Sequence, residues 1–210
     1  NFAIPGIMGD GLRMAWEAGA DRLPVRIEMA ADLGGGEPAN GGVSNIFKQP
    51  NLLVNRFGKR VMNEDFMQNA TYLSNVADHQ KDKTCFSIID TSIVKYYVKH
   101  GVEVTSLVSP NPDVSDFYEG IETILNNGSR NFFRADTIEE LAEKAGIDVE
   151  NLKETIEDYN YFCDSYDQEF FKDQKYLRPI FKAPFYAAAI HPGGYGTVGG
   201  VRINENCEAC

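Results

Sequence analysis

Apolar positions in the first hundred residues follow short helical and strand periods. Three apolar side chains within residues 12–16 are spaced i, i+3, i+4 and follow Asp10, which predicts a short helix with Asp10 at or near its N-cap. Residues 85–90 form a mostly apolar run that is typical of a buried strand. Residues 92–100 have a helical pattern that ends before Gly101. These patterns indicate a chain in which helices and strands alternate.

Two further patterns predict a hairpin and a pair of helices. Residues 52–55 and 60–63 are apolar runs on either side of a turn that contains Gly58, which indicates a β-hairpin. Residues 137–140 form a capping box, in which Thr accepts from the N3 amide and Glu reaches back to the N-cap amide. A second helix is expected to begin near Asp148, with an apolar stripe along one face.

Two segments are rich in glycine. Residues 31–50 show no periodicity and are predicted to form a long loop, and long loops in compact domains are usually functional or disordered. Residues 191–200 formally contain G-x-G-x-x-G, but Pro192 precedes it and residues 201–204 have the pattern of a strand instead of a helix. A dinucleotide fingerprint is therefore rejected. The bare backbone allows close approach of a flat ligand, with structural turns alone as the other interpretation.

Composition removes several classes of function. The chain has 210 residues and a formal charge of −11, with no basic run that could follow a phosphate backbone, so we expect no nucleic-acid partner. No apolar run reaches the roughly 20 residues of a membrane span, so no insertion into a bilayer is expected. Cys207 and Cys210 have C-x-x-C spacing but no second ligand pair, so no metal site is predicted.

Both ends of the chain lack the features of natural termini. The chain begins at Asn1 without an initiator Met, and it stops at Cys210 without a terminating pattern. We expect it to be a piece of a longer protein.

Four blocks of the sequence, taken in order, resemble the fumarate reductase/succinate dehydrogenase flavoprotein family. They are residues 9–11 with 18–20, residues 53–64, residues 137–160, and residues 184–187 continuing to 199–201. In that family an FAD-binding domain is interrupted by a capping domain that closes over the flavin. The resemblance implies that the dinucleotide fingerprint lies upstream of Asn1 and the last catalytic motif downstream of Cys210.

The resemblance also implies a division of the chain. Residues 24–184 are expected to form the capping domain, an α+β fold with a small mixed sheet and helices packed on it. Residues 1–23 and 185–210 are expected to be stubs of the FAD-binding domain that pair with each other.

Some residues match positions that the family uses. Asp10 matches an aspartate near the flavin, and Gly199 and Gly200 match the pair whose backbone approaches the isoalloxazine ring. These three are the candidate cofactor-binding residues. Arg60 and Glu64 match the hairpin of the cap, where we expect a structural ion pair in preference to a catalytic role.

Other positions depart from the family. Gln68 stands where fumarate reducers carry the arginine that protonates the substrate, and a neutral amide cannot act as that acid. Tyr195-Gly196 replaces the histidine that binds a substrate carboxylate, and residues 25–50 contain no His-Pro-Thr. The phenol of Tyr195 can donate a hydrogen bond or proton to a carbonyl or enolate, and Tyr72 is a second candidate. The candidate catalytic positions are therefore Tyr195 and Gln68, each of which could instead be structural.

Two classes of function remain open from the sequence. The first is a fragment of an FAD-dependent oxidoreductase that transfers hydride between flavin and an activated C–C double bond, with a substrate other than fumarate. Its partners would be the missing FAD-binding domain of the same chain and a small unsaturated molecule. The fragment alone would be inactive and would bind FAD weakly, because the phosphate cradle is missing. The alternative is a non-catalytic binding module that keeps the cap fold.

Overall fold

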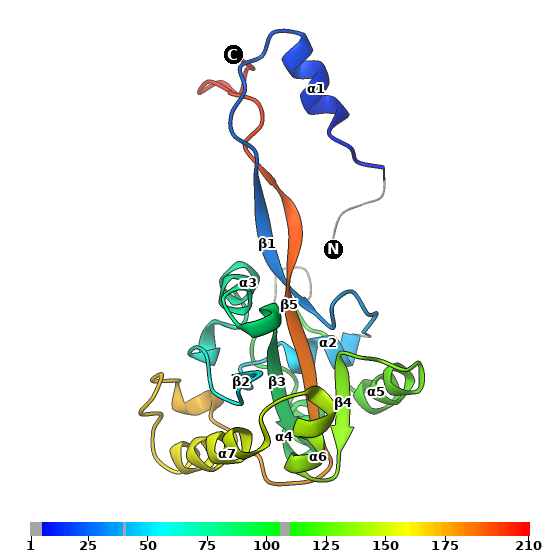
Figure 1. The fold of residues 1–210 in the computed structure, drawn as a ribbon, viewed down its shortest axis with the longest axis vertical. Helices are drawn as coiled ribbons and strands as arrows, with labels where there is room; N and C mark the ends of the chain where they lie inside the picture. The colour runs from blue at the N-terminus through cyan, green and yellow to red at the C-terminus, as the bar shows by residue number, and fades with distance from the viewer. Residues whose placement is uncertain (1–5, 40, 106–109) are drawn as a thin grey trace.

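A long two-stranded arm joins a helix-covered sheet to the terminal segments of the chain (Figure 1). The computed structural model describes residues 6–39, 41–105 and 110–210. Helix α1 (Asp10–Glu17) and the C-terminus lie together at one end of the arm, and helices α4, α6 and α7 lie beyond its other end. The arm therefore separates two parts of the chain that have little contact with each other.

Five strands form one sheet in the order β1-β5-β3-β2, with β4 paired to β5 off this path. They are β1 (Arg26–Leu33), β2 (Leu52–Asn55), β3 (Cys85–Asp90), β4 (Phe132–Ala135) and β5 (Phe185–Val198). Every strand pair in the described residues is antiparallel. The predicted α+β class is confirmed, with an antiparallel sheet in place of the expected mixed one.

Strand β5 has two halves with different neighbours. Residues 185–190 pair with β3, and residues 185–188 also pair with β4, so this half lies inside the sheet and is buried. Residues 191–198 pair with β1 alone and form the arm, and Ile190 pairs with both β1 and β3. The predicted boundary at residue 184 therefore falls just before a central strand of the sheet.

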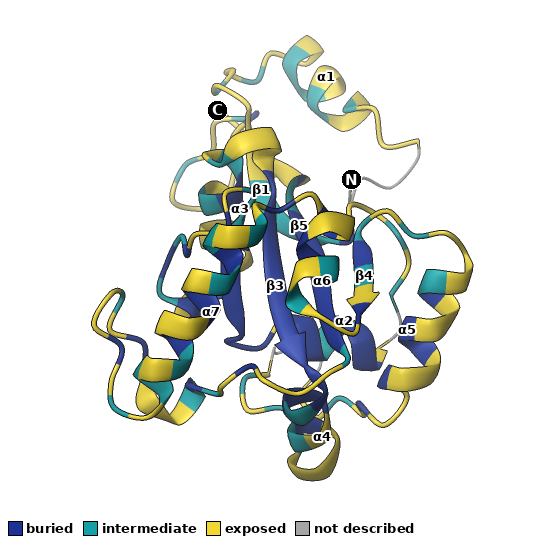
Figure 2. Ribbon diagram, turned by 60° about the horizontal axis from the view of Figure 1, so that its bottom comes forward, coloured by how far each residue is buried: buried dark blue, intermediate teal, exposed yellow. Residues whose placement is uncertain are grey.

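Six helices pack their apolar faces around the sheet (Figure 2). They are α2 (Gly41–Phe47), α3 (Ala70–Asp78), α4 (Thr91–His100), α5 (Phe117–Asn126), α6 (Ile138–Ala145) and α7 (Val149–Cys163). Phe47 is fully buried, and its ring centroid lies 6.0 Å from that of Phe117 and 5.9 Å from that of Phe132. A smaller cluster lies beneath α3, where Leu73 is buried beside Cys85. No helix in the described part of the chain has the length and apolar character needed to span a bilayer.

Most elements predicted from periodicity are confirmed. The strand at residues 85–90 and the helix that follows it form as expected, and Gly101 is the C-cap of α4. The capping box forms with one difference: the Thr137 hydroxyl accepts from the Glu140 amide, but the Glu140 carboxylate accepts from the Asp136 amide. Helix α1 has Gly9 as its N-cap, so Asp10 is its first residue.

The prediction of a long loop at residues 31–50 is wrong. Strand β1 continues to Leu33, and α2 occupies Gly41–Phe47, with residue 40 outside the described part. Helix α2 forms despite its two glycines because Val43, Ile46 and Phe47 are fully buried in the core. Tertiary packing overrides the low helix propensity of this segment.

Two other predicted strand pairings are reduced to single bridges. The hairpin closes through one bridge between Val54 and Arg60, while β2 takes β3 as its main neighbour. Residues 201–204 form bridges from Val201 to Arg22 and from Ile203 to Ala209. Residues 60–63 and residues 201–204 therefore do not add further strands to the sheet.

The terminal segments pair with each other, which confirms that part of the prediction. Arg22 bridges Val201, the Asp21 amide donates to the Cys210 carbonyl at 2.6 Å, and the Arg202 amide donates to the Asp21 carbonyl at 3.0 Å. Both Cys207 and Cys210 are exposed and free. Residues 185–190 do not follow this pattern, because they lie in the sheet.

A buried ionic cluster fastens the hairpin to the segment after α7. The Arg60 guanidinium donates to both Glu64 oxygens at 3.0 and 2.7 Å and to both Asp167 oxygens at 2.8 Å. The Lys172 ammonium lies 3.6 Å from Glu64 and donates to the Tyr159 hydroxyl at 2.8 Å. Two cations thus face two carboxylates, all with almost no solvent exposure. The ion pair expected for Arg60 and Glu64 is confirmed.

Burial and the bonds within the cluster shift the pKa values of its members. Burial raises the pKa of Asp167, but hydrogen bonds from Arg60 and from the Lys172 amide outweigh it and hold the pKa at about 2. Burial lowers the pKa of Lys172, and nearby Glu64 opposes that change. A cluster of this kind destabilises the fold strongly when one partner is removed, because the remaining charges are left unpaired in the interior.

We predict that Arg60→Met destabilises the protein by about 3 to 5 kcal/mol, because Glu64 and Asp167 lose their shared cation inside the core. Urea unfolding followed by circular dichroism measures the change. The control is Lys59→Met, which breaks an exposed pair with Glu154 and is expected to change stability much less. Equal effects of the two substitutions would contradict the structural role given to Arg60.

Candidate functional site

A pocket of about 320 Å³ lies at the foot of the arm, where β1 enters the sheet. Its walls come from the end of β1, the turn that follows, and one face of α2. The lining residues are Ala31, Asp32, Leu33, Gly36, Glu37, Ala39, Ser44 and Lys48. Asp32 is buried and accepts a hydrogen bond from the Gly36 amide at 3.1 Å, which holds the turn closed. The pocket therefore combines an apolar wall with two carboxylates, one hydroxyl and one ammonium.

Gln68 lies close to this pocket, between the 3₁₀ helix η1 (Glu64–Phe66) and α3. Its side-chain amide donates to the Lys48 carbonyl at 3.1 Å and to the Val104 carbonyl at 3.3 Å. The side chain is half-buried. The amide thus connects three chain segments, and nothing in its contacts gives it the chemistry of an acid.

Lys48 is a site residue that sequence reasoning missed. It directly follows α2 and reaches solvent at the mouth of the pocket. The surrounding protein displaces water and lowers the pKa of Lys48, while the negative charge of Asp32 acts in the opposite direction. The sequence did contain one indication of this position, because Lys48 is the only basic residue between Arg26 and Arg56.

Tyr195 lies on the arm, in a β-bulge. The register of β1 and β5 shifts between Glu28, which faces Gly196, and Met29, which faces Gly194, so Tyr195 has no directly opposed residue. Its side chain is 63% exposed. Bulges turn a side chain away from the regular direction and occur next to active sites. The arm thus presents a phenol to whatever packs against it.

The structure does not bring Tyr195 and Gln68 together. Tyr195 is four residues along β5 from His191, which pairs with Asp32 at the level of the pocket. That separation corresponds to about 13 Å along a strand. Tyr72, the second candidate, lies on α3 with its ring 6.0 Å from that of Phe66, and it is not among the residues that line the pocket.

His191 lies in β5 and has a structural position. Its Nε2 is 3.0 Å from the Asn131 side-chain oxygen, and its Nδ1 is 3.2 Å from the Thr84 hydroxyl. The Asn131 amide donates to Glu37 at 2.7 Å, so the Asn131 oxygen faces the histidine and accepts from Nε2. This chain of bonds links the foot of the arm to β4.

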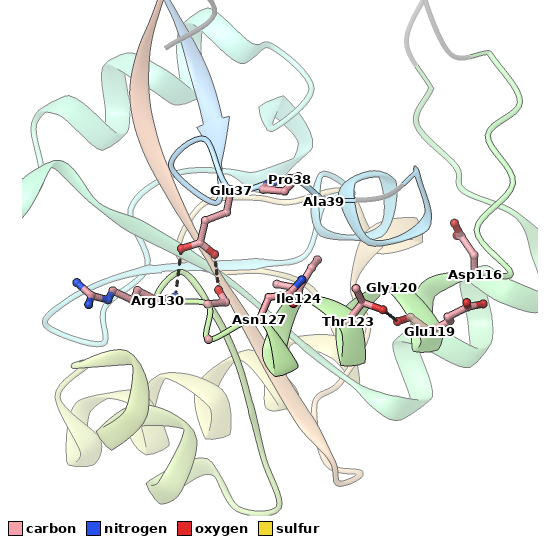
Figure 3. A pocket seen from close by; sticks show the side chains of 12 residues that line it. Glu37, Pro38, Ala39, Asp116, Glu119, Gly120, Thr123, Ile124, Asn127 and Arg130 are labelled. Carbon is pink, nitrogen blue, oxygen red and sulfur yellow. Dashed lines mark hydrogen bonds between the residues drawn. The ribbon is translucent and has the colours of Figure 1, made fainter.

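A larger cavity of about 780 Å³ lies between residues 37–39 and α5 (Figure 3). Glu37 lines both cavities and accepts from the Ser129 hydroxyl, from the Arg130 amide at 3.1 Å and from Asn131. Its carboxylate is therefore fully occupied by structural bonds. In the described residues, no group of three or more His, Cys, Asp or Glu side chains is placed to hold a metal ion.

The residues that match flavin-contacting positions lie at the far end of the arm. Asp10 begins α1 and is exposed, 3.7 Å from Arg13. Gly199 and Gly200 both have positive φ, 92° and 110°. A Cβ on Gly199 would lie 2.2 Å from the Pro24 carbonyl oxygen, and one on Gly200 would lie 2.7 Å from Leu12. Gly199 is thus required by a backbone contact within this chain, and Gly200 is favoured by its positive φ.

The described residues around Gly199 and Gly200 do not form a phosphate cradle. The glycine-rich stretch continues β5 up to Val198, and among the described residues no helix N-terminus follows it. The Gly200 carbonyl accepts from the Trp16 indole at 2.9 Å, which ties α1 to the end of the arm. A group that carries pyrophosphate would need binding residues from elsewhere in the protein.

Comparison with known families decides the relationship. The sequence profile of the FAD binding domain family matches residues 2–210. The chain belongs to this family. FAD is the cofactor of the family, and the resemblance to fumarate reductase-like flavoproteins is confirmed.

Named relatives agree with this assignment. Vinyl phenol reductase from Lactiplantibacillus plantarum is 29% identical over 224 residues, covering 95% of this chain and 42% of that protein. Fumarate reductase (cytochrome) from Shewanella frigidimarina is 27% identical over 207 residues, covering 97% of this chain and 31% of that protein. This chain therefore spans less than half the length of these relatives.

A solved structure shares the fold. The 3-ketosteroid delta1-dehydrogenase from Sterolibacterium denitrificans, in complex with 1,4-androstadiene-3,17-dione, matches with a TM-score of 0.66 at 22% identity. The match covers all of this chain and 40% of that one. At this level of identity the likeness concerns the fold alone.

We predict that Gly199→Ala loosens the contact between the terminal segments and the arm, because its Cβ would collide with the Pro24 carbonyl and its φ is unfavourable for alanine. Hydrogen exchange at the Leu23 amide, which donates to the Gly200 carbonyl, measures the effect. Gly196→Ala is the control, since its Cβ would enter open space. Unchanged protection of Leu23 in Gly199→Ala would contradict this account.

Proposed function

We propose that this chain is the substrate-covering part of an FAD-dependent oxidoreductase that reduces an activated C–C double bond. The observation that carries the proposal is the position of the small pocket at the foot of the arm that leads to the terminal segments. Membership of an FAD-binding family supports it, as do relatives whose names contain a vinyl phenol and fumarate, both of which have a C=C bond.

The division into domains follows from the same proposal. Residues 1–23 and the outer part of β5 with residues 199–210 would belong to the FAD-binding domain, and residues 24–184 to the covering domain. The pairing of β5 supports one revision, because residues 185–190 are hydrogen-bonded to β3 and β4. We place the change of domain within the arm, beyond Ile190.

The residues of this chain would orient and polarise the substrate. FAD, when bound and reduced, supplies the hydride. The exposed phenol of Tyr195 would donate a hydrogen bond to a carbonyl or enolate oxygen. The amide of Gln68 is held by the carbonyls of Lys48 and Val104, so it serves to position those segments. Asp10, Gly199 and Gly200 would line the flavin side.

A non-catalytic binding module remains the second candidate. The observation that favours it is the neutral, hydrogen-bonded Gln68 at the position where fumarate reducers are expected to carry their acid. Flavin reoxidation by an unsaturated compound, measured on the whole protein, separates the two candidates.

We predict that residues 1–210 alone bind FAD weakly or not at all, because the described residues contain no phosphate cradle. Titration of micromolar protein with FAD, followed by flavin fluorescence, should show no saturable quenching. Tight stoichiometric binding would show that the chain has been placed wrongly in its parent.

For the whole protein, we predict that a neutral or singly charged enone or enoate is reduced much faster than fumarate. A dicarboxylate needs cationic groups at both ends, and Gln68 and Tyr195 have replaced two of those contacts. Tyr195→Phe should lower the rate about 100-fold or more with the best substrate. Reduced viologen oxidation with a panel of unsaturated acids and ketones provides the measurement.

Tyr166→Phe is the matched control, because Tyr166 is similarly exposed at 60% but lies outside the arm. Rapid turnover of fumarate would overturn the substrate assignment. An unchanged rate in Tyr195→Phe would remove Tyr195 from the site.

A further inference from the structure

The small pocket at the foot of the arm contains an amine and a hydroxyl that make no bond within the described part of the chain. The Lys48 ammonium has no hydrogen-bond partner and no ion pair there, unlike the ammonium groups of Lys59 and Lys144. The Ser44 hydroxyl is also free of hydrogen bonds to the described residues. Both groups are therefore available to a molecule that enters the pocket.

The two groups come from one face of the same helical segment. Ser44 lies on α2, and Lys48 follows directly after the helix. Residues four positions apart lie on the same side of a helix, and the Lys48 amide continues the helical pattern by donating to the Ser44 carbonyl at 3.3 Å. The Lys48 carbonyl in turn accepts from the Gln68 side chain at 3.1 Å. The backbone that carries the lysine is thus held on both sides.

The remaining lining gives the pocket an apolar wall. Ala31 and Leu33 come from the end of β1, and Ala39 comes from the segment between β1 and α2. The volume of about 320 Å³ is at the lower end of the range for ligand pockets, which is roughly 300 to 1,000 Å³. The pocket can therefore hold a small group with a short hydrocarbon chain beside the amine.

The charges around Lys48 leave its amine reactive. The surrounding protein displaces water and lowers the pKa of Lys48, and the carboxylate of Asp32 opposes this effect. Glu37, the other carboxylate of the pocket, is held by the Arg130 amide and the Asn131 side chain. A lowered pKa increases the fraction of the lysine in the neutral form, which is the nucleophile.

We propose that Lys48 is a site of covalent acylation, where its side-chain nitrogen takes a short acyl group from an acyl thioester. The neutral nitrogen attacks the thioester carbonyl, and a C–N bond forms as the C–S bond breaks. The thiolate leaves with the electron pair of that bond. Of the two protons that the ammonium loses, one goes to water before the attack and one goes to the departing thiolate. No oxidant or reductant takes part.

The acylated lysine fits the groups that line the pocket. In this form the Ser44 hydroxyl donates to the carbonyl oxygen of the new amide, and the alkyl chain contacts Ala31 and Leu33. Acylation removes the positive charge of a lysine. Lys48 is the only basic residue among the described residues that line this pocket, so its acylation leaves the carboxylates as the only charged groups there.

The test treats the full-length flavoprotein with S-acetyl-N-acetylcysteamine, a small uncharged acyl thioester, near neutral pH. Proteolysis and mass spectrometry then give the initial rate of acetylation at each lysine. Lys48 should be acetylated several-fold faster than Lys95, an exposed lysine on α4 that lies outside the pocket. Equal rates at the two lysines overturn the proposal.

The length of the acyl chain separates a pocket from a lysine that is merely reactive. Acetyl, propionyl and butyryl thioesters of N-acetylcysteamine should all label Lys48 in preference to Lys95, because the apolar wall accommodates a short chain. The decanoyl thioester should lose this preference, because its chain is too long for a pocket of about 320 Å³. A preference that is the same for all four thioesters contradicts a site built by the pocket.

The hydroxyl provides a second readout at the same site. Ser44→Ala should lower the acetylation rate of Lys48 several-fold and leave that of Lys95 unchanged, because the acyl carbonyl loses its hydrogen-bond donor. Ser165→Ala, at an exposed position outside the pocket, is the matched control and should change neither rate. Circular dichroism checks that both variants are folded. An unchanged Lys48 rate in folded Ser44→Ala contradicts the site as described.

This proposal and the proposed function fail separately. The acylation needs neither flavin nor an unsaturated substrate, and Gly199 and Gly200, the candidate flavin contacts, lie at the other end of the arm. A protein that reduces no unsaturated compound can therefore still be acylated at Lys48, which would leave this proposal standing. A protein that turns over but acylates Lys48 and Lys95 equally would overturn this proposal alone.

Discussion

Strand β5 is the constraint on which the structure depends. Its first half is hydrogen-bonded to β3 and β4, and its second half to β1 alone, so one 14-residue strand forms both the centre of the sheet and the arm. Residues 187–189 are three buried alanines, whose small side chains allow helices to pack closely over the sheet. The helix-covered sheet and the terminal segments are therefore joined by a single continuous strand.

The buried cluster around Arg60 holds the hairpin and the segment that leads to Gln68. It fastens the hairpin and η1 to the segment after α7, and Gln68 follows two residues after η1. Since the guanidinium binds both carboxylates through paired hydrogen bonds, the hairpin has little freedom to move relative to the core. Gln68 then joins this rigid unit to Lys48 at the end of α2. The pocket is thus bounded by the end of β1 and by α2, and Gln68 ties the chain after α2 to the hairpin.

The chemistry of the site follows from what these two supports place nearby. The arm presents a phenol in a bulge, and the pocket below it presents an ammonium with a lowered pKa. About 13 Å of strand separates Tyr195 from the level of the pocket, so the phenol and the ammonium lie at different points along the arm.

The sequence by itself determined the elements whose stability is local. The strand at residues 85–90, helix α4 with Gly101 as its C-cap, and helices α6 and α7 with side-chain N-caps were predictable because their signals lie within a few residues of each other. The Arg60–Glu64 pair was also within reach, since the residues are four positions apart. Helix α2 was not predictable, because its glycines give it a low helix propensity. It is stabilised by tertiary packing of Phe47 against Phe117 of α5 and Phe132 of β4. Only the tertiary structure joined Gln68 to Lys48 and Arg60 to Asp167, because contacts across 20 and 107 residues depend on how the chain folds back and not on local spacing.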